Sequence, residues 1–343
     1  MKKVLAITLA VIICAAAIIV LTKNDGGQDD ELLCRSYHEI EEEEEKKYIK
    51  WVDFTPSCSL MKKAIDYDIQ SFGQTPHMNW IELLAYTAAK CGGKFNKNSA
   101  SDMQKLVERL QQGETMEQIT DGMRFYGYYE EAYTAVLAEY IGEYEIQLTN
   151  DMGEQYWDKR YGLKVYSPIA KGFGFGHYRD FGVERTYGYK RKHLGNDLMG
   201  TVGIPIVAIE GGYVEALGWN EFGGWRIGIR SYDKLRYYYY AHLRKDHPYV
   251  KTLKEGDTVE AGEVIGYMGL TGYSKKENVN NLKRPHLHLG VQLIFDESQK
   301  DGVNQIWIDL YEIVELLQQN KADVMKIEET GEYVHSYRIR EVE

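Results

Sequence analysis

The sequence is poor in cysteine and has no excess of basic residues. Its 343 residues include only four cysteines, too few for a disulfide-linked scaffold. Forty-one Lys and Arg stand against 52 Asp and Glu, and the net charge of -11 argues against nucleic acid as a partner. Hydrophobic residues make up 44% and charged residues 27%, a globular composition. At roughly 150 residues per domain, the length predicts two folded units with additional segments.

Charged residues are absent between Lys3 and Lys23. The segment between them, Val4–Thr22, has 19 residues and would span about 28 Å as a helix, close to the thickness of a bilayer core. We therefore expect residues 1–22 to be a transmembrane signal anchor. Lysines precede the segment and acidic residues follow it. We therefore expect a single-pass membrane protein whose amino terminus lies in the cytoplasm and whose remaining residues lie outside the cell membrane. The alternative is a secreted protein released by signal cleavage near Ala15–Ala17.

Three of the four cysteines follow this segment, at positions 34, 58 and 91. An odd number in an oxidising compartment leaves at least one thiol unpaired or paired with another chain. If two of them pair, their shared helical region favours Cys58 with Cys91.

The chain after the anchor divides by its patterning into a linker, a helical part, a β-rich part and a tail. Residues 23–47 form an acidic linker, and residues 48–145 have the apolar spacing of about five helices in a small bundle. Asn79 with Glu82 and Thr115 with Gln118 are typical of helix starts. The bundle has no cluster of metal-binding or nucleophilic residues, so its apolar stripes indicate a core. Residues 321–343 are a charged tail.

Residues 146–320 consist of short alternating segments separated by glycine-rich turns. This pattern predicts many antiparallel strands in a β-sandwich or barrel-like core. The multidomain chain would thus combine a membrane helix, an all-α bundle and an all-β domain. Helical spacing returns at residues 305–318. The expected strands are residues 205–209, 212–217, 225–230, 236–243 and 286–295.

Histidines in the β-rich part indicate a metal site. His286 and His288 are two residues apart on an expected strand, so they project from one face while Leu287 points into the core. Zinc binds neutral imidazole, and upstream His193 is followed four residues later by Asp197. Gly195 lies between these two residues and predicts an extended or turning backbone rather than a helix. A His, an Asp and a further His would give three ligands and leave one coordination position open, as catalytic zinc sites do. No cysteine lies in this half of the chain to close the site.

Residues 191–295 resemble the lysostaphin/LytM-type zinc endopeptidases that cut peptidoglycan peptides. The resemblance rests on four motifs: HLGND at residues 193–197, YAHL at 240–243, the turn EGDTVEAGEVIGYMGLTG at 255–272 and PHLHLGV at 285–291. It implies one zinc ion per chain, bound by His193, Asp197 and His288. It also implies that His242 and His286 handle the proton and the developing oxyanion. Asn196 departs from the family, which often has histidine there, but it is no ligand position.

The resemblance and the expected anchor together imply a membrane-anchored, extracytoplasmic zinc endopeptidase that hydrolyses peptidoglycan stem peptides or cross-bridges. Zinc would lower the pKa of a bound water to about 7, and imidazoles with ordinary pKa values near 6.5 suit the proton transfers. The alternative is a non-catalytic LytM-like wall-binding or scaffold protein, possibly in sporulation or cell division. Inactive relatives typically lack a residue of the set above, whereas this sequence keeps all of them. The helical domain is a possible site for an extracytoplasmic protein partner.

Overall fold

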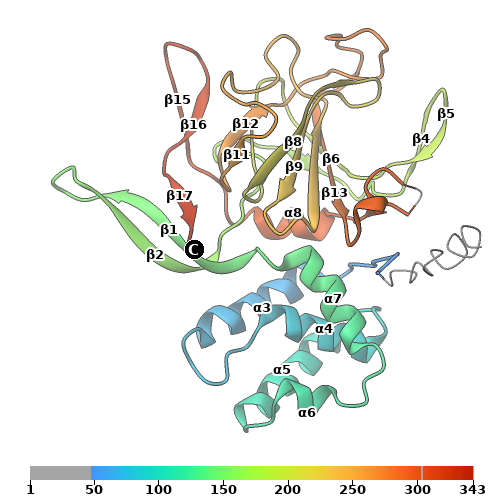
Figure 1. The fold of residues 1–343 in the computed structure, drawn as a ribbon, viewed down its shortest axis with the longest axis vertical. Helices are drawn as coiled ribbons and strands as arrows, with labels where there is room; N and C mark the ends of the chain where they lie inside the picture. The colour runs from blue at the N-terminus through green and yellow to red at the C-terminus, as the bar shows by residue number, and fades with distance from the viewer. Residues whose placement is uncertain (1–47, 303, 343) are drawn as a thin grey trace, which may run out of the picture. The chain divides into compact units, whose positions relative to one another are not determined.

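The structure is a computed structural model that describes residues 48–302 and 304–342 (Figure 1). The predicted anchor (1–22), the acidic linker (23–47) and Cys34 lie outside the described residues. No helix in the described part of the chain is both long and apolar enough to cross a bilayer.

Five helices follow one another in the amino-terminal part, the number that the apolar spacing predicts. They are α3 (Cys58–Ser71), α4 (Trp80–Cys91), α5 (Ser99–Gln111), α6 (Met116–Thr120) and α7 (Tyr126–Leu137). Both predicted caps are confirmed. The Asn79 side chain accepts hydrogen bonds from the backbone N–H groups of Ile81 and Glu82, and Thr115 forms a reciprocal capping box with Gln118.

Cys58 and Cys91 are free thiols, so the proposed disulfide between them is wrong. Their surroundings differ. The Cys58 backbone N–H donates to the Glu312 carboxylate at 2.7 Å, whereas the Cys91 Sγ lies 3.7 Å from the carbonyl oxygen of Ala88, one turn earlier in its own helix. A shared helical region is therefore too coarse a criterion for pairing cysteines, because a disulfide requires a specific Cα and Cβ geometry.

The carboxy-terminal part is built on an antiparallel sheet, as predicted. Its strand order is β11-β8-β9-β10-β13-β6-β3, and β14 also pairs with β13. A small second sheet pairs β7 with β12, and it contributes Ile206 and Ile265 to the same hydrophobic core as Ile227 and Ile229 of β9. The strands are β3 (Gly176–His177), β6 (Asn196–Met199), β7 (Pro205–Val207), β8 (Gly212–Asn220), β9 (Gly224–Ser231), β10 (Arg236–Ala241), β11 (Thr258–Val259), β12 (Val264–Tyr267), β13 (His286–Leu293) and β14 (Ile306–Trp307).

Strand β13 lies between β10 and β6, and this neighbourhood positions the site. In the observed register, His288 is directly opposite Asp197 of β6 on one side and Ala241 of β10 on the other. Leu287 and Leu289 are fully buried, while His286 and His288 project from the opposite face, so the predicted alternation is confirmed. Because His242 comes directly after β10, the same face gathers residues from three strands.

Two hairpins and the tail complete the described chain. Strands β1 (Ile141–Thr149) and β2 (Gln155–Leu163) form a long hairpin, and the shorter β4 (Glu184–Tyr187) pairs with β5 (Tyr189–Lys192). The predicted boundary between residues 145 and 146 falls inside β1. The charged tail forms further strands: β15 (Val324–Lys326), β16 (Tyr333–His335) and β17 (Ile339–Glu341), the last of which pairs with β1.

The helix expected at residues 305–318 is shorter than predicted. Ile306 and Trp307 pair with β13 as strand β14, and α8 covers only Tyr311–Leu317. Asp309 lies between the end of β14 and the start of α8, and its carboxylate accepts hydrogen bonds from the Tyr311 backbone N–H and the Asn196 side chain. The prediction was wrong for the first residues because Ile306 occupies an edge of the sheet rather than a helix face.

One buried ion pair joins the helices to the main sheet. The Arg236 guanidinium donates to both oxygens of Glu210 at 2.9 Å, and its Nη1 donates to the carbonyl oxygen of Ala135 in α7 at 2.8 Å. Burial of this kind requires every donor to have a partner, and the Asp233 carboxylate supplies another. Residues 49–343 form one compact unit.

Candidate metal centre

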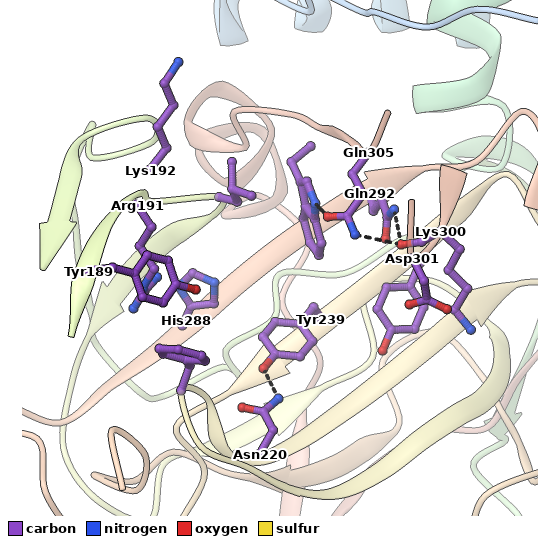
Figure 2. A pocket seen from close by; sticks show the side chains of 14 residues that line it. Tyr189, Arg191, Lys192, Asn220, Tyr239, His288, Gln292, Lys300, Asp301 and Gln305 are labelled. Atoms are coloured by element: carbon purple, nitrogen blue, oxygen red, sulfur yellow. Dashed lines mark hydrogen bonds between the residues drawn. The ribbon is translucent and has the colours of Figure 1, made fainter. Parts of the chain in front are cut away.

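A groove of about 630 Å³ lies over the main sheet beside the β4–β5 hairpin (Figure 2). Its lining is aromatic and polar, and His288 lies at one end. A smaller cavity of about 100 Å³ contains His193, Asp197, His242 and His288. The two spaces share four lining residues, which makes the groove continuous with the histidine cluster. These shared residues are Arg191, Phe222, Tyr239 and His288.

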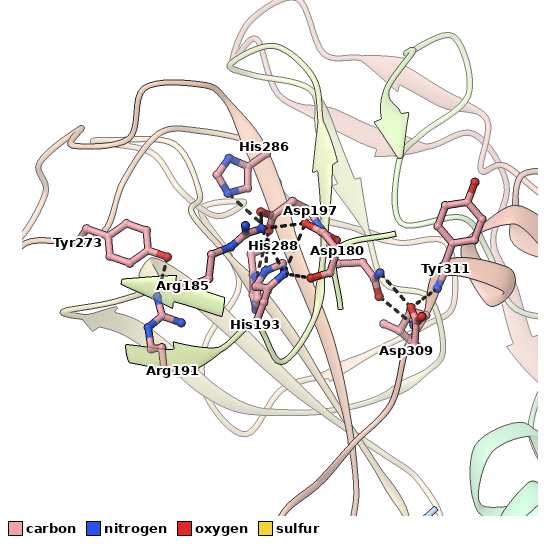
Figure 3. A network of polar contacts seen from close by, with 12 residues as sticks. Asp180, Arg185, Arg191, His193, Asp197, Tyr273, His286, His288, Asp309 and Tyr311 are labelled. Atoms are coloured by element: carbon pink, nitrogen blue, oxygen red, sulfur yellow. Dashed lines mark hydrogen bonds and ion pairs between the residues drawn. The ribbon is translucent and has the colours of Figure 1, made fainter. Parts of the chain in front are cut away.

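The structure brings His193, Asp197 and His288 together (Figure 3). The Nε2 atom of His193 lies 2.9 Å from Nδ1 of His288 and 3.1 Å from Oδ1 of Asp197. The third separation, between His288 Nδ1 and Asp197 Oδ1, is 3.2 Å. Three donor atoms from β6, β13 and the chain just after β5 thus converge on one point, as the sequence predicted.

A glycine makes this convergence possible. Gly195 stands between the two residues of the HLGND motif, and a Cβ there would lie 2.5 Å from the carbonyl oxygen of Leu289 and 2.8 Å from Nε2 of His288. Only glycine allows the backbone to approach β13 so closely. The extended or turning backbone that Gly195 predicts is therefore confirmed.

The donor set fits a zinc ion. Zinc lies about 2.0–2.1 Å from imidazole nitrogen, and a tetrahedral site with such bonds separates neighbouring ligand atoms by about 3.3 Å. The observed separations of 2.9–3.2 Å are close to this value. The Nδ1–H of His193 donates to the carbonyl oxygen of Asp180 at 2.9 Å, so in the neutral ring the lone pair on Nε2 faces the cluster.

The protonation states also suit a metal. Burial tends to raise the pKa of Asp197, but hydrogen bonds with His193 and His288 outweigh it and hold this pKa far below its usual range. Burial lowers the pKa of His288 despite the nearby carboxylate. At neutral pH the site therefore offers an ionised carboxylate and a neutral imidazole, the forms that bind zinc.

The other two predicted residues, His242 and His286, lie beside the cluster with their rings 4.8 Å apart. Nδ1 of His242 donates to the carbonyl oxygen of Thr271 at 2.8 Å, and Nδ1 of His286 donates to that of Arg284 at 2.9 Å. These bonds leave Nε2 as the proton-exchanging atom of each ring, and Nε2 of His286 lies 3.6 Å from Oδ1 of Asp197. Burial, followed by the neighbouring histidines, lowers the pKa of His242 well below its ordinary value, so its ring is neutral near pH 7.

Sequence reasoning missed Asp180 and Arg185. Nη2 of Arg185, on β4, donates to Oδ2 of Asp197 at 3.1 Å and to Oδ2 of Asp180 at 3.0 Å. It therefore holds the carboxylate oxygen that does not face the histidines. No spacing rule connects these residues to the HLGND motif, because a loop and a hairpin separate them from it.

An antiparallel sheet with a His–Asp–His cluster beside an open groove is what the resemblance to LytM-type endopeptidases predicts. More specifically, residues 191–303 match peptidase family M23. This confirms the predicted resemblance, and the β-rich part of the chain contains an M23 domain.

Relatives and solved structures agree with this assignment. The chain is 38% identical over 124 residues to an L-Ala–D-Glu endopeptidase of Bacillus subtilis, covering 36% of each chain. It is 36% identical over 119 residues to the glycyl-glycine endopeptidase ALE-1 of Staphylococcus capitis, covering 34% of this chain and 28% of that one. The chain thus spans about a third or less of the length of these curated relatives.

A solved structure described as a putative glycyl-glycine endopeptidase lytM from Ruminococcus gnavus superposes with a TM-score of 0.51. It covers 77% of this chain and 88% of that chain at 23% sequence identity. At this identity the likeness shows a common fold, extending well beyond the segment that matches the family.

Proposed function

We propose that this protein is a zinc endopeptidase that hydrolyses peptide bonds in peptidoglycan stem peptides or cross-bridges. The observation that carries the proposal is the convergence of His193, Asp197 and His288 donor atoms, 2.9–3.2 Å apart, at the end of an open groove. The relatives support the substrate class, because their names describe endopeptidases and two of them specify the bond.

One zinc ion per chain would be held by His193, Asp197 and His288. When bound there, zinc supplies a Lewis acid that polarises the scissile carbonyl group and lowers the pKa of a coordinated water to about 7. Arg185 and Asp180 keep the ligands in place, since Arg185 binds the second oxygen of Asp197 and the Asp180 carbonyl group orients the His193 ring.

His242 and His286 would carry the proton transfers. Their Nδ1 atoms are occupied by backbone carbonyl groups, so Nε2 is the atom that accepts a proton from the attacking water and returns it to the leaving amine. A protonated Nε2 also donates a hydrogen bond to the oxyanion that forms from the peptide carbonyl group. The low pKa of His242 keeps a neutral acceptor available near pH 7.

We further propose that the protein is anchored in the cell membrane with this domain outside. The apolar segment at residues 4–22 supports the proposal, as does the substrate class. Release after signal cleavage is the alternative. Extraction of membranes with alkaline carbonate, followed by amino-terminal sequencing, distinguishes an intact anchor from a cleaved signal. The helical part would be available for an extracytoplasmic protein partner.

The test of the enzymatic proposal is digestion of purified peptidoglycan by the full chain in detergent. Mass spectrometry of the released fragments identifies the bond that is cut. We expect chelation of zinc to abolish release and added zinc to restore it. Hydrolysis that persists in metal-free protein would reject the zinc mechanism.

A further inference from the structure

The β4–β5 hairpin carries two arginines that face each other and differ in their partners. Arg185 and Arg191 are directly opposite in the observed register. Like charges in this position destabilise a hairpin unless each is compensated. Arg185 is compensated by Asp180 and Asp197. Arg191 has no carboxylate within ion-pair distance among the residues that the structure describes.

Arg191 is held rigidly although it has no acidic partner. Its Nη2 donates to the Tyr273 hydroxyl at 2.6 Å, and its guanidinium lies 5.1 Å from the ring centre of Phe222 and 5.4 Å from that of Tyr273. Its Nε atom is buried and has no hydrogen-bond partner. A buried N–H group without an acceptor costs about 1–3 kcal/mol, so this orientation favours a ligand that supplies one.

The position of Arg191 links the metal cluster to the groove. It lines the 630 Å³ groove (Figure 2) and also the 100 Å³ cavity. A peptide whose scissile carbonyl group lies at the metal ligands would therefore place an adjacent residue against the guanidinium, because consecutive Cα atoms are only about 3.8 Å apart.

The groove, like Arg191 itself, is positively charged. Arg191, Lys192 and Lys300 line it, against the single acidic residue Asp301. Lys300 is already paired with Glu215, and the Lys192 side chain extends away from the other lining residues (Figure 2), which leaves Arg191 as the cation that can attract an anion. This local positive charge occurs on a chain whose net charge is -11. A planar guanidinium suits a carboxylate, which it binds through two parallel hydrogen bonds.

We propose that Arg191 binds a free carboxylate on the substrate residue next to the scissile bond, so that the enzyme selects acidic peptides over neutral ones. This inference rests on the proposed function and names the substrate class of the same site. Arg191 is thereby a specificity-determining residue that contacts substrate, while Arg185 is a positioning residue that acts through Asp197.

The test uses two peptides with an alanyl–glutamyl bond that differ in one group, a free carboxylate in the first and an amide in the second. We expect the zinc-loaded full chain to bind and cleave the acidic peptide roughly 10- to 100-fold better, as measured by calorimetric Kd and by kcat/KM. Arg191→Met should abolish the preference, and Arg191→Lys should keep part of it. Lys190→Met is the matched control, because it removes an equal charge from the same strand but lines neither cavity; it should keep the preference.

Equal affinity of the wild-type protein for the two peptides would overturn the inference, as would a preference that survives in Arg191→Met. The zinc content of Arg191→Met, measured alongside, must equal that of the wild-type protein if the residue acts on substrate alone. A binding preference without cleavage would contradict the proposed function and still support carboxylate recognition, so the two failures are distinguishable.

Discussion

Two aspartates, the buried Asp68 and the half-buried Asp197, are each paired with histidine and have different roles. Asp68 in α3 lies 3.1 Å from Nε2 of His77, just as Asp197 lies 3.1 Å from Nε2 of His193. The Asp68 carboxylate also accepts hydrogen bonds from the Trp80 backbone N–H and the Tyr161 hydroxyl. Each of its two oxygens thus accepts a hydrogen bond.

Asp197 has a different set of neighbours. Its Oδ1 faces nitrogen atoms of three histidines, at 3.1, 3.2 and 3.6 Å. One of these atoms, Nε2 of His193, belongs to a ring whose Nδ1 lies 2.9 Å from the carbonyl oxygen of Asp180. The cluster also lines a cavity. A carboxylate that is shielded from solvent therefore stabilises the fold when hydrogen-bond donors surround it. It can bind a metal when imidazole lone pairs and a cavity surround it.

The sharpest test of this comparison is Asp197→Ala. We expect zinc to fall from about one ion per chain to nearly none, and hydrolysis to fall by at least roughly 1,000-fold, since a bound metal contributes several kcal/mol to transition-state stabilisation. Metal analysis and peptide assays measure the two effects. The comparison breaks down if the variant keeps stoichiometric zinc.

Asp68→Ala is the counterpart in the helical part. It leaves the Trp80 N–H and the Tyr161 hydroxyl without their acceptor, so the free energy of unfolding should fall by about 2–4 kcal/mol. Zinc content and kcat/KM at low temperature should be unchanged. Denaturant titration measures the loss, and a variant as stable as the wild-type protein would show that this carboxylate is dispensable.

Arg185→Gln tests whether residues around the ligands tune metal binding. Loss of the hydrogen bond to Oδ2 frees Asp197 to rotate, and we expect zinc affinity to fall roughly 10- to 100-fold. Competition with a chelator of known affinity measures this, and Arg185→Lys should restore part of it. Lys190→Gln on the same hairpin serves as the control. An unchanged affinity in Arg185→Gln would assign the residue to hairpin stability alone.

His335, a half-buried histidine outside the cluster, gives the smallest expected effect and tests what a histidine does without an acidic partner. His335 has no carboxylate within ion-pair distance in the described part of the chain, and burial lowers its pKa to about 4. The unfolded chain, with an ordinary pKa near 6.5, binds a proton first as the pH falls. Stability should therefore decrease between about pH 6.5 and pH 4, by about 1–2 kcal/mol after allowance for solvent screening.

Urea denaturation at several pH values measures this decrease, and His335→Gln should flatten the curve over that range. The metal site also responds to acid, so the comparison is made between the two proteins in the presence of a chelator. A difference between wild type and variant that does not change with pH would contradict the assignment to His335.

Local rules pointed to the candidate site residues, and the family resemblance then selected the expected ligands among them. Strand alternation placed His286 and His288 on one face, and Gly195 indicated the extended backbone that carries Asp197. Capping chemistry located the helix starts at Asn79 and Thr115 in the same way. Such rules depend only on neighbours in the chain, which is why they succeed without a structure.

The remaining features depend on contacts between distant segments. Arg185 meets Asp197 only because the β4–β5 hairpin packs beside β6, and Ile306 becomes a strand residue only because β13 offers it an edge. The tail pairs with β1 across nearly 200 positions of sequence, as in the contact of Arg340 with Glu145. No local pattern encodes these pairings.

The buried guanidinium of Arg236 has a practical consequence for anyone who trims the chain. Constructing the family segment alone would remove Ala135, whose carbonyl oxygen accepts a hydrogen bond from Nη1. The guanidinium, which has no exposure to solvent in the intact protein, would lose this acceptor, and the apolar core that α7 covers would be opened to water. The smallest fragment that keeps this contact is therefore expected to begin before the helices, near residue 49, rather than at the first residue that matches the family.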